Sequence, residues 1–171
     1  MSKIILETER LTLCEFSTDD APFVVELMND ESYLRFIGDR GIKTVDDARN
    51  YLLNGPIKSY QQFGFGLFLV KLKESDIPVG TCGLIKRPEL DDVDVGYAFL
   101  AEFRGKGYAT EAGRAVIDYA RTGAGLKRVV AITVPDNYAS IKVVEKLGLS
   151  FEKTIIWPDS DEEINLFSVE L

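Results

Sequence analysis

The chain has 171 residues, of which 46% are hydrophobic and 28% charged, a composition that suits one soluble globular domain with its own apolar core. Its 28 acidic and 20 basic residues give a formal net charge of −8, which argues against nucleic acid as a partner and suits a cationic amine, although the charge is also ordinary for a cytoplasmic protein. The absence of histidine removes Ser-His and Cys-His nucleophile pairs and argues against a transition-metal site.

Cysteine use and hydropathy point to an intracellular location. Cys14 and Cys82 each lie in an apolar strand-like run, so we expect buried free thiols, as in a reducing compartment. The apolar stretch at the N-terminus is too short for a signal peptide, and no run approaches the roughly 20 apolar residues of a membrane span. We therefore expect a cytoplasmic protein with no membrane partner, in which residues 1–171 form a single domain.

The first part of the chain predicts one strand and two helices. Residues 11–16 alternate apolar with polar or small side chains, as in a strand. Acidic residues at 18–20 suit a helix N-terminus, and the apolar residues that follow recur at helical spacing. A second helix is expected to begin at Thr44, with Asp47 completing a capping box.

The remainder of the chain predicts six strands and two helices. Residues 65–72 and 78–85 resemble an antiparallel hairpin, and residues 92–100 form the next strand pattern. A Gly-rich segment then leads into a helical pattern that stops at Gly123. The remaining predicted elements are a strand at 128–134, a helix at 137–147, and strands at 151–156 and 164–169. The order βααβββαβαββ describes a mixed α+β domain of about seven strands and about four helices.

The most informative segment precedes the first of these two helices and reads Arg104-Gly105-Lys106-Gly107-Tyr108-Ala109. A helix N-terminus carries unpaired N–H groups and a partial positive charge, so it holds a phosphate well if the chain can approach closely. Gly105 and Gly107 remove the side chains that would block this approach, and Arg104 and Lys106 add positive charge. An ordinary Gly-rich turn into a helix would have the same composition.

Two known phosphate-binding motifs do not fit this segment. It lacks the Gly-x-x-x-x-Gly-Lys-Ser/Thr pattern of a P-loop. The dinucleotide pattern Gly-x-Gly-x-x-Gly is incomplete, because Thr110 stands where the third glycine belongs. The segment instead resembles motif A of the GCN5-related N-acetyltransferase (GNAT) superfamily, Arg/Gln-x-x-Gly-x-Gly/Ala, with Arg104, Gly107 and Ala109 at its positions.

Further motifs extend the resemblance over nearly the whole chain. The run from Gly96 to Ala112 looks like the RimJ/RimL-type branch, the ribosomal-protein N-terminal acetyltransferases and their relatives. A helix motif that runs from Asn137 through Ser140 to Glu145-Lys146-Leu147-Gly148 is similar to the family's Asn-x-x-Ser/Ala … Glu-Lys-x-Gly-Phe. The segment at 9–13 resembles the family's opening strand.

The resemblance implies a twisted, mostly antiparallel sheet with a V-shaped split between its fourth and fifth strands, residues 92–100 and 128–134, where acetyl-CoA binds as co-substrate. The pantetheine arm would pair with backbone, as an added strand does at an open edge. Asn137 would hydrogen-bond the pantetheine, and Ser140 would lie near the thioester sulfur. The implied backbone contacts are Tyr97, Ala98 and Phe99 for the pantetheine arm and Gly105, Lys106, Gly107, Tyr108, Ala109 and Thr110 for the pyrophosphate.

Acetyl transfer to an amine requires a base, donors for the tetrahedral oxyanion and a stabilised leaving thiolate. Asp94 stands at the acidic position of the family pattern Glu-Ile-Gly-Tyr and is the leading candidate for the base, directly or through a water. A solvated acidic turn around Asp94 is the alternative. Glu102 and Glu111 are rivals, although a carboxylate at the position of Glu111 is favoured by the helix dipole alone.

The leaving thiolate has a separate candidate. Val144 stands where many family members carry a tyrosine, and Ser140 takes the role in the RimL-type branch. A serine hydroxyl is a weak acid, so hydrogen bonding to the thiolate describes its role better than proton transfer. An ordinary hydroxyl in the first turn of a helix is the alternative for Ser140, and Tyr138 competes with it.

The resulting prediction is an N-acetyltransferase that moves an acetyl group from acetyl-CoA to a primary amine of a protein N-terminus or small molecule, by direct attack in a ternary complex without a metal. A non-catalytic acyl-CoA-binding or regulatory module on the same fold is one alternative, and an unrelated nucleotide-binding protein is another. Residues 29–62 and the C-terminal hairpin would select the acceptor, and neither carries a motif that identifies it. Monomer and homodimer both remain open.

Overall fold

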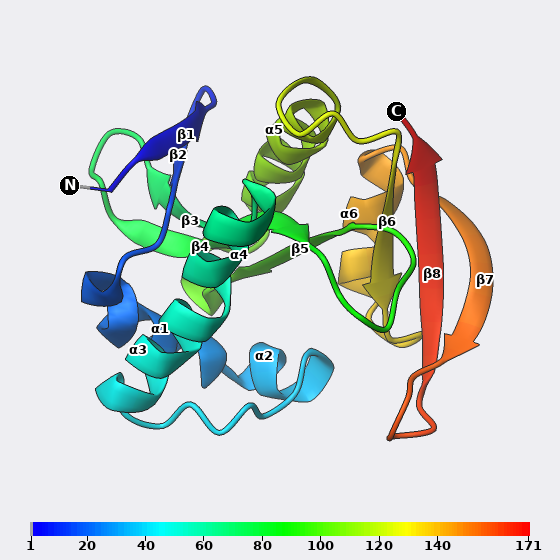
Figure 1. Cartoon of the computed structure of the whole chain (residues 1–171), viewed down its shortest axis with the longest axis horizontal. Coiled ribbons are helices and arrows are strands. Elements are labelled where there is room, and N and C mark those ends of the chain that lie inside the picture. Colours follow the sequence, from blue (N-terminus) through cyan, green and yellow to red (C-terminus); the bar gives the residue numbers. More distant parts are fainter. Residues whose placement is uncertain (1) are drawn as a thin grey trace.

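The computed structural model describes residues 2–171, and the strands of this region form one sheet in the order β1-β2-β3-β4-β5-β6-β8-β7 (Figure 1). Neighbouring strands are antiparallel except β5 and β6, which are parallel. The strands are β1 (Ile4–Glu7), β2 (Leu11–Cys14), β3 (Leu67–Leu72), β4 (Pro78–Ile85), β5 (Asp94–Phe99), β6 (Arg128–Thr133), β7 (Ser150–Ile156) and β8 (Glu163–Glu170). The mixed, mostly antiparallel sheet predicted from the sequence is confirmed.

The helices are α1 (Ala21–Met28), α2 (Glu31–Phe36), α3 (Val45–Asn54), α4 (Pro56–Phe63), α5 (Tyr108–Thr122) and α6 (Tyr138–Lys146), with short 3₁₀ turns at Thr18–Asp20 and Ala101–Phe103. The predicted capping box of α3 is confirmed, because the side chains of Thr44 and Asp47 each accept from the other's backbone N–H. None of these helices in residues 2–171 is long and apolar enough to cross a membrane.

Three elements were missing from the predicted order, which held about seven strands and about four helices. β1 adds an eighth strand at the sheet edge, and α2 and α4 add two helices. Each of these two helices buries a single side chain, Tyr33 and Pro56 respectively, so neither shows an apolar period. Their starts depend on local capping instead: Asp30 caps α2 with its carboxylate, and Pro56 occupies the first turn of α4.

Apolar side chains cover the sheet on both faces. On one face Leu13, Phe68 and Val70 pack with Val116 of α5 and Val144 of α6. On the other face the alternate strand residues pack against α1 and α3, as the cluster of Cys14, Leu69, Leu27 and Leu52 shows. Both cysteines, Cys14 and Cys82, are buried and free, as predicted. The sheet is therefore the middle of three layers.

The sheet is continuous on either side of β5 and β6 but barely joined between them. Strands β4 and β5 pair from Ile85–Asp94 to Gly80–Phe99, whereas β5 and β6 share one register pair, Asp94 and Val130. Beyond that pair the two strands separate, and β6, β8 and β7 stand together on one side of the molecule (Figure 1). The two strands therefore diverge where the split between residues 92–100 and 128–134 was expected, and we call the gap between their diverging ends the opening.

Candidate active site

The segment at the N-terminus of α5 has the backbone that an anion site requires. Gly105 and Gly107 have φ angles of 75° and 83°, the left-handed region that glycine tolerates and other residues rarely adopt. Gly107 is the N-cap residue of α5, and among residues 2–171 no side chain caps it. The first amides of a helix have no partner within the helix, so Tyr108, Ala109 and Thr110 present N–H groups at this point.

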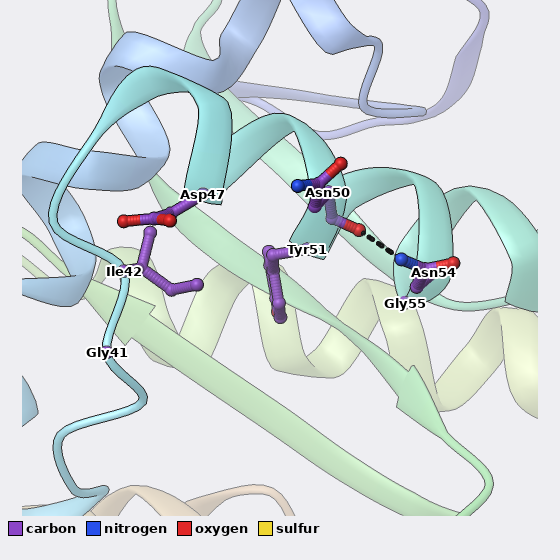
Figure 2. A pocket seen from close by; sticks show the side chains of 7 residues that line it. All are labelled: Gly41, Ile42, Asp47, Asn50, Tyr51, Asn54 and Gly55. Atoms are coloured by element: carbon purple, nitrogen blue, oxygen red, sulfur yellow. Dashed lines mark hydrogen bonds between the residues drawn. The ribbon is translucent and has the colours of Figure 1, made fainter.

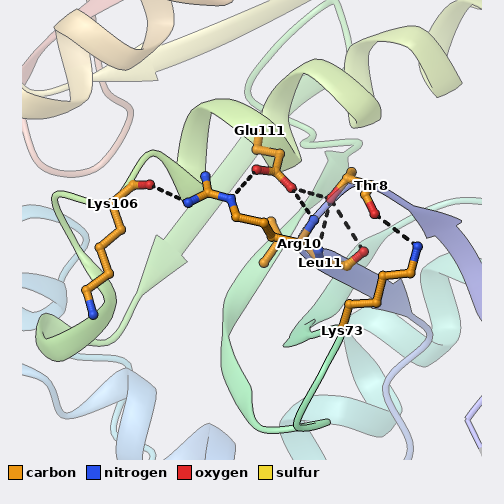
Figure 3. Close-up of polar contacts among 6 residues, drawn as sticks. All are labelled: Thr8, Arg10, Leu11, Lys73, Lys106 and Glu111. Carbon is orange, nitrogen blue, oxygen red and sulfur yellow. Dashed lines mark hydrogen bonds and ion pairs between the residues drawn. The ribbon is translucent and has the colours of Figure 1, made fainter.

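A polar network joins this segment to the turn between β1 and β2 (Figure 3). Arg10 donates through Nε to Glu111 Oε1 at 2.7 Å and through Nη1 to the carbonyl oxygen of Lys106 at 2.9 Å. Glu111 Oε2 also accepts from the Arg10 amide at 2.9 Å and from the Thr8 hydroxyl at 2.5 Å. Burial raises the pKa of Glu111, but these hydrogen bonds outweigh it and leave the pKa below its ordinary value. Both oxygens of the Glu111 carboxylate are thus occupied by hydrogen bonds that hold the fold together.

Arg10 also packs on the helix that it anchors. Its guanidinium carbon lies 4.5 Å from the centroid of the Tyr108 ring, a cation–π distance. A Cβ atom at Gly107 would lie 3.3 Å from Arg10 Nη2. Gly107 is therefore required twice, by its positive φ and by the approach of Arg10.

Arg104 turns its side chain toward α2. Its Nε donates to the Phe99 carbonyl oxygen at 3.0 Å and its Nη1 to the Ser32 hydroxyl at 3.3 Å, while Nη2 forms an ion pair with Asp30. Asp30 is the residue that caps α2. The guanidinium thus links the end of β5 to α2, and Lys106 is left as the other cation of the segment.

Asp94 is the most perturbed carboxyl group of the site. It is 1% exposed, and its two oxygens accept from Arg87 Nε at 3.2 and 3.3 Å. Burial raises the pKa of Asp94 to about 6, against the opposing effect of Arg87. The side chain is therefore not part of a solvated acidic turn. Its rival Glu102 is exposed.

Tyr97 and Ser140 meet where β5 separates from β6. The Tyr97 hydroxyl lies 2.7 Å from Ser140 Oγ and 3.1 Å from the Ser140 carbonyl oxygen. Asn137 is the N-cap of α6, and its Oδ1 accepts from the Ser140 amide at 3.3 Å. Burial raises the pKa of Tyr97 to about 12, so the phenol stays protonated at neutral pH. Tyr138 is 71% exposed, which disfavours it as a competitor.

The sequence-predicted residues fall into two groups on β5. Side chains alternate along a strand, so Asp94 and Ala98 point to one face and Tyr97 and Phe99 to the other. Phe99 packs with α5 and α6, and Ala98 packs on the cluster of α1 and α3. The structure therefore brings Tyr97 and Ser140 together and places Asp94 on the opposite face.

Thr133, at the end of β6, is a feature that the sequence did not indicate. It is 5% exposed, and its hydroxyl has no hydrogen-bond partner among the described residues. Such a hydroxyl costs about 1–3 kcal/mol of stability, so an unpaired one calls for an explanation. Arg10, Arg87 and Asp30 were also missed, because their partners lie far along the chain or carry no motif.

A cavity lies elsewhere, over α3 and the loop before it (Figure 2). Its volume is about 390 Å³, and it is open to solvent. The Asp47 carboxylate in its wall is already engaged in the capping box of α3. None of the predicted site residues lines it; its walls are Gly41, Ile42, Asp47, Asn50, Tyr51, Asn54 and Gly55. Within residues 2–171 no group of acidic or cysteine side chains is arranged to hold a metal ion.

Comparison with known proteins gives one family. The model of the acetyltransferase (GNAT) domain matches residues 10–150. The uncharacterized N-acetyltransferase p20 of Bacillus licheniformis is 32% identical over 151 residues, which cover 86% of this chain and 82% of p20. A GNAT-family acetyltransferase structure from Bacillus anthracis superposes with a TM-score of 0.80 at 27% identity, covering 96% of this chain and 97% of that one.

A more distant solved structure shares the fold. RimL, a ribosomal L7/L12 α-N-protein acetyltransferase solved with coenzyme A, superposes with a TM-score of 0.83 at 18% identity. The match covers 99% of this chain and 98% of RimL. At this level of identity the likeness concerns the fold alone.

Proposed function

The chain belongs to the acetyltransferase (GNAT) domain family, and on that premise we propose that residues 1–171 form one enzyme domain that transfers the acetyl group of acetyl-CoA to a primary amine. The observation that carries the proposal is the juxtaposition of an uncapped helix N-terminus, Gly105–Thr110, with the opening between β5 and β6. An anion is stabilised at such a terminus, and an extended ligand can pair at an open strand edge.

The proposed cofactor contacts use both features. The pyrophosphate binds the amides of Gly105 to Thr110, with Lys106 as the available cation. The pantetheine arm pairs with backbone of Tyr97, Ala98 and Phe99, on the side of β5 that β6 leaves open beyond Asp94. The side-chain oxygen of Asn137, Oδ1, already caps α6, so the side-chain nitrogen, Nδ2, is the group that donates to the pantetheine.

The proposed chemistry is direct attack in a ternary complex. Asp94 is the base, directly or through a water: its raised pKa, about 6, makes it a better proton acceptor than an ordinary aspartate and leaves it ionised at neutral pH. Arg87 holds the carboxylate in place and limits how far burial raises its pKa. Ser140 donates a hydrogen bond to the departing sulfur. No covalent enzyme intermediate is needed, which suits a chain without histidine.

The acceptor is a primary amine of a protein N-terminus or of a small molecule. The resemblance of residues 96–112 to RimJ/RimL-type enzymes supports a protein N-terminus as the first class to test. We propose that the enzyme acts as a cytoplasmic monomer or homodimer, with neither nucleic acid nor membrane as a partner.

A thiol-release assay tests the function. Acetyl-CoA is incubated with N-terminal peptides, polyamines, amino acids and aminoglycosides, and free thiol is followed. Wild type is expected to release thiol with at least one amine class, and Gly105→Glu is expected to lose both release and coenzyme A binding, because a carboxylate then faces the pyrophosphate. Gly125→Glu is the matched control: both glycines have positive φ, 75° and 67°, and nothing lies within 4 Å of an added Cβ at either.

The outcomes separate the alternatives. Coenzyme A binding without turnover on any amine would favour a non-catalytic acyl-CoA-binding module. Equal loss of binding in the Gly105 and Gly125 variants would mean that backbone strain, rather than charge in the loop, is responsible, and would remove the support for this loop as the pyrophosphate site.

A further inference from the structure

The guanidinium of Arg87 uses only its Nε in the fold. That nitrogen donates to both oxygens of Asp94, at 3.2 and 3.3 Å. Nη1 and Nη2 have no hydrogen-bond or ion-pair partner among residues 2–171, although the side chain is only 23% exposed. Both nitrogens touch solvent, because within these residues Thr133 Oγ1 is the one fully buried side-chain nitrogen or oxygen without a partner. Unused N–H donors therefore lie beside the proposed base.

The proposed base faces a part of the molecule that two tyrosines border. Asp94 and Gly96 point to the same face of β5. A Cβ atom at Gly96 would lie 3.7 Å from Leu67 Cδ2, and Leu67 lines a small cavity together with Tyr33 of α2 and Tyr51 of α3. Tyr51 also lines the solvent-open cavity over α3 (Figure 2). The face that carries Asp94 is thus connected, through Leu67 and the two phenols, to α2 and α3.

Two arginines act on these phenols. Burial raises the pKa of Tyr33 to about 12, and the positive charges of Arg40 and Arg87 oppose this rise. Burial also raises the pKa of Tyr51, and the same two charges oppose it. The Coulomb energy falls with distance, so both guanidinium groups lie near both phenols. Arg40 is exposed and forms no ion pair within residues 2–171.

These two arginines offer a recognition group for a carboxylate. The nearby negative charges are Asp94 itself and the exposed Glu89, whose effect on the pKa of Asp94 is weaker than that of Arg87. A guanidinium presents its N–H groups as a planar fork that matches the two oxygens of a carboxylate. In Arg87 the fork of Nη1 and Nη2 remains available, because Asp94 occupies only Nε.

We propose that the acceptor carries a carboxylate a few bonds from its amine, and that the Nη1–Nη2 fork of Arg87 binds this carboxylate while the amine faces Asp94. The inference rests on the proposed acetyltransferase function and names its acceptor class. Arg40 adds positive charge to the same site, and Tyr33 and Tyr51 form the wall on the side of α2 and α3. Two sources share this chemistry: the α-carboxylate of a free amino acid, and the side-chain carboxylate of an acidic N-terminal residue of a protein.

One guanidinium then orients both reacting partners. Its Nε holds the base, and its fork holds the acceptor, so the amine is placed within reach of Asp94. The amine nitrogen forms a bond to the thioester carbonyl carbon, and its proton passes to Asp94 directly or through water. The C–S bond breaks with its electron pair on sulfur. The acceptor carboxylate and the Arg87 guanidinium keep their charges throughout.

Matched acceptor pairs test the proposal in the thiol-release assay. One pair is L-alanine and L-alaninamide, and the other is two C-terminally amidated peptides that differ only in an N-terminal aspartate or asparagine. Wild type is expected to favour the carboxylate member of one pair by about tenfold or more in kcat/KM, since the amide offers the fork one oxygen and no charge. The pair that shows the preference identifies the source. Absence of a preference for the carboxylate in both pairs would overturn the proposal.

Arg87→Lys keeps the positive charge and loses the fork. It should reduce the preference for the carboxylate about tenfold. If Arg87 only positions Asp94, both members of the pair will slow by the same factor and the preference will be unchanged, which would overturn the proposal. Arg49→Lys is the matched control and should keep the wild-type preference, because Arg49 pairs with Asp46 on α3.

Arg40→Gln provides a second variant at an exposed position. It should raise KM for the carboxylate member about threefold and leave KM for the amide member unchanged, because only the former is attracted by the charge. Should Arg87→Lys fail to fold, this comparison decides, and an equal change in KM for both members would overturn the proposal. A wild type that acetylates no amine of any class would instead overturn the proposed function itself.

Discussion

At the scale of single residues, Asp94 is a carboxyl group that is both buried and ionised at neutral pH, a combination that costs free energy. It is 1% exposed, yet among residues 2–171 only one guanidinium, that of Arg87, lies within hydrogen-bond distance of its oxygens. A buried carboxylate with an incomplete set of partners loses part of its acidity, which explains a pKa of about 6. That value suits a group which must be ionised at neutral pH and still accept a proton.

Asp94 therefore predicts the pH dependence of catalysis. With an acceptor amine held in excess, kcat should rise about tenfold per pH unit below pH 6 and level off above it, because the base must be deprotonated. Asp94→Asn should lose at least 100-fold in kcat and show no such rise. The measurement is a pH–rate profile between pH 5 and pH 8. A wild-type profile that is flat through pH 6 would remove Asp94 from the role.

The same residue predicts a pH dependence of stability. A folded pKa raised above the unfolded value means that Asp94 stabilises the fold at pH values below the unfolded pKa, and that this contribution is lost as pH rises through about 6. Asparagine resembles the protonated acid, so Asp94→Asn and wild type should have similar free energies of unfolding near pH 4. By pH 7 the variant should be the more stable by up to about 3 kcal/mol. Urea unfolding at the two pH values checks this; an unchanged difference would contradict it.

Single residues also show what sequence can reveal. Gly105 and Gly107 identified the loop, because glycine lets a ligand approach the backbone closely; their φ angles of 75° and 83° lie in the region that glycine adopts most readily. The burial of Asp94 and the pairing of Tyr97 with Ser140 could not be predicted, since they depend on residues 7 and 43 positions away in the chain. Thr133 resembles any strand threonine until its missing partner is seen.

At the scale of elements, the β1–β2 turn and the start of α5 act as one unit (Figure 3). The bonds of Arg10 to Glu111 and to the Lys106 carbonyl hold the loop in one shape without a ligand, and under the proposed function that shape is the one that receives the pyrophosphate. A preorganised site does not lose affinity to ordering the loop on binding. Under the proposed function, Arg10 is therefore a positioning residue for the cofactor.

Arg10→Ala is accordingly expected to weaken coenzyme A binding about tenfold, which corresponds to roughly 1.4 kcal/mol. Arg121→Ala is the matched control, because Arg121 pairs with Asp118 on the same helix. Calorimetric titration measures both variants, with melting temperatures recorded beside them. Similar affinities in the two variants would mean that the network stabilises the fold without shaping the loop.

A second link joins the loop to α2. Arg104 pairs with Asp30, the cap of α2, while its Nε holds the Phe99 carbonyl. A double-mutant cycle with Arg104→Gln and Asp30→Asn should give a coupling of about 0.5–1 kcal/mol in the free energy of unfolding, since the pair is partly exposed. Additive effects in the double variant would show that the two side chains act separately.

Elements differ in how well sequence predicts them. The start of α3 was read from Thr44 and Asp47, because a capping box is local. The helices α2 and α4 were missed, since six and eight residues with one buried side chain each carry no apolar period. The role of Arg10 could not be read, because its partner Glu111 lies 101 positions away.

At the scale of the whole molecule, the sheet consists of two parts joined by the single Asp94–Val130 pair. The alternation of apolar residues predicted most strands and the mixed fold, and the family resemblance placed the split. Side chains also join the two parts: Arg128 of β6 pairs with Asp92, which precedes β5, and with Glu152 and Glu170 of β7 and β8. No local sequence pattern indicates these ion pairs. The opening between the parts is the proposed binding site of acetyl-CoA.

Hydrogen–deuterium exchange with and without acetyl-CoA tests this placement most directly. In the free protein the amides of Tyr108, Ala109 and Thr110 lack helical partners and should exchange fast. Acetyl-CoA should slow exchange in peptides covering residues 97–110 and 133–140, and leave the walls of the α3 cavity, residues 41–55, unchanged. Protection confined to residues 41–55, with none at 97–110, would contradict acetyl-CoA binding between β5 and β6.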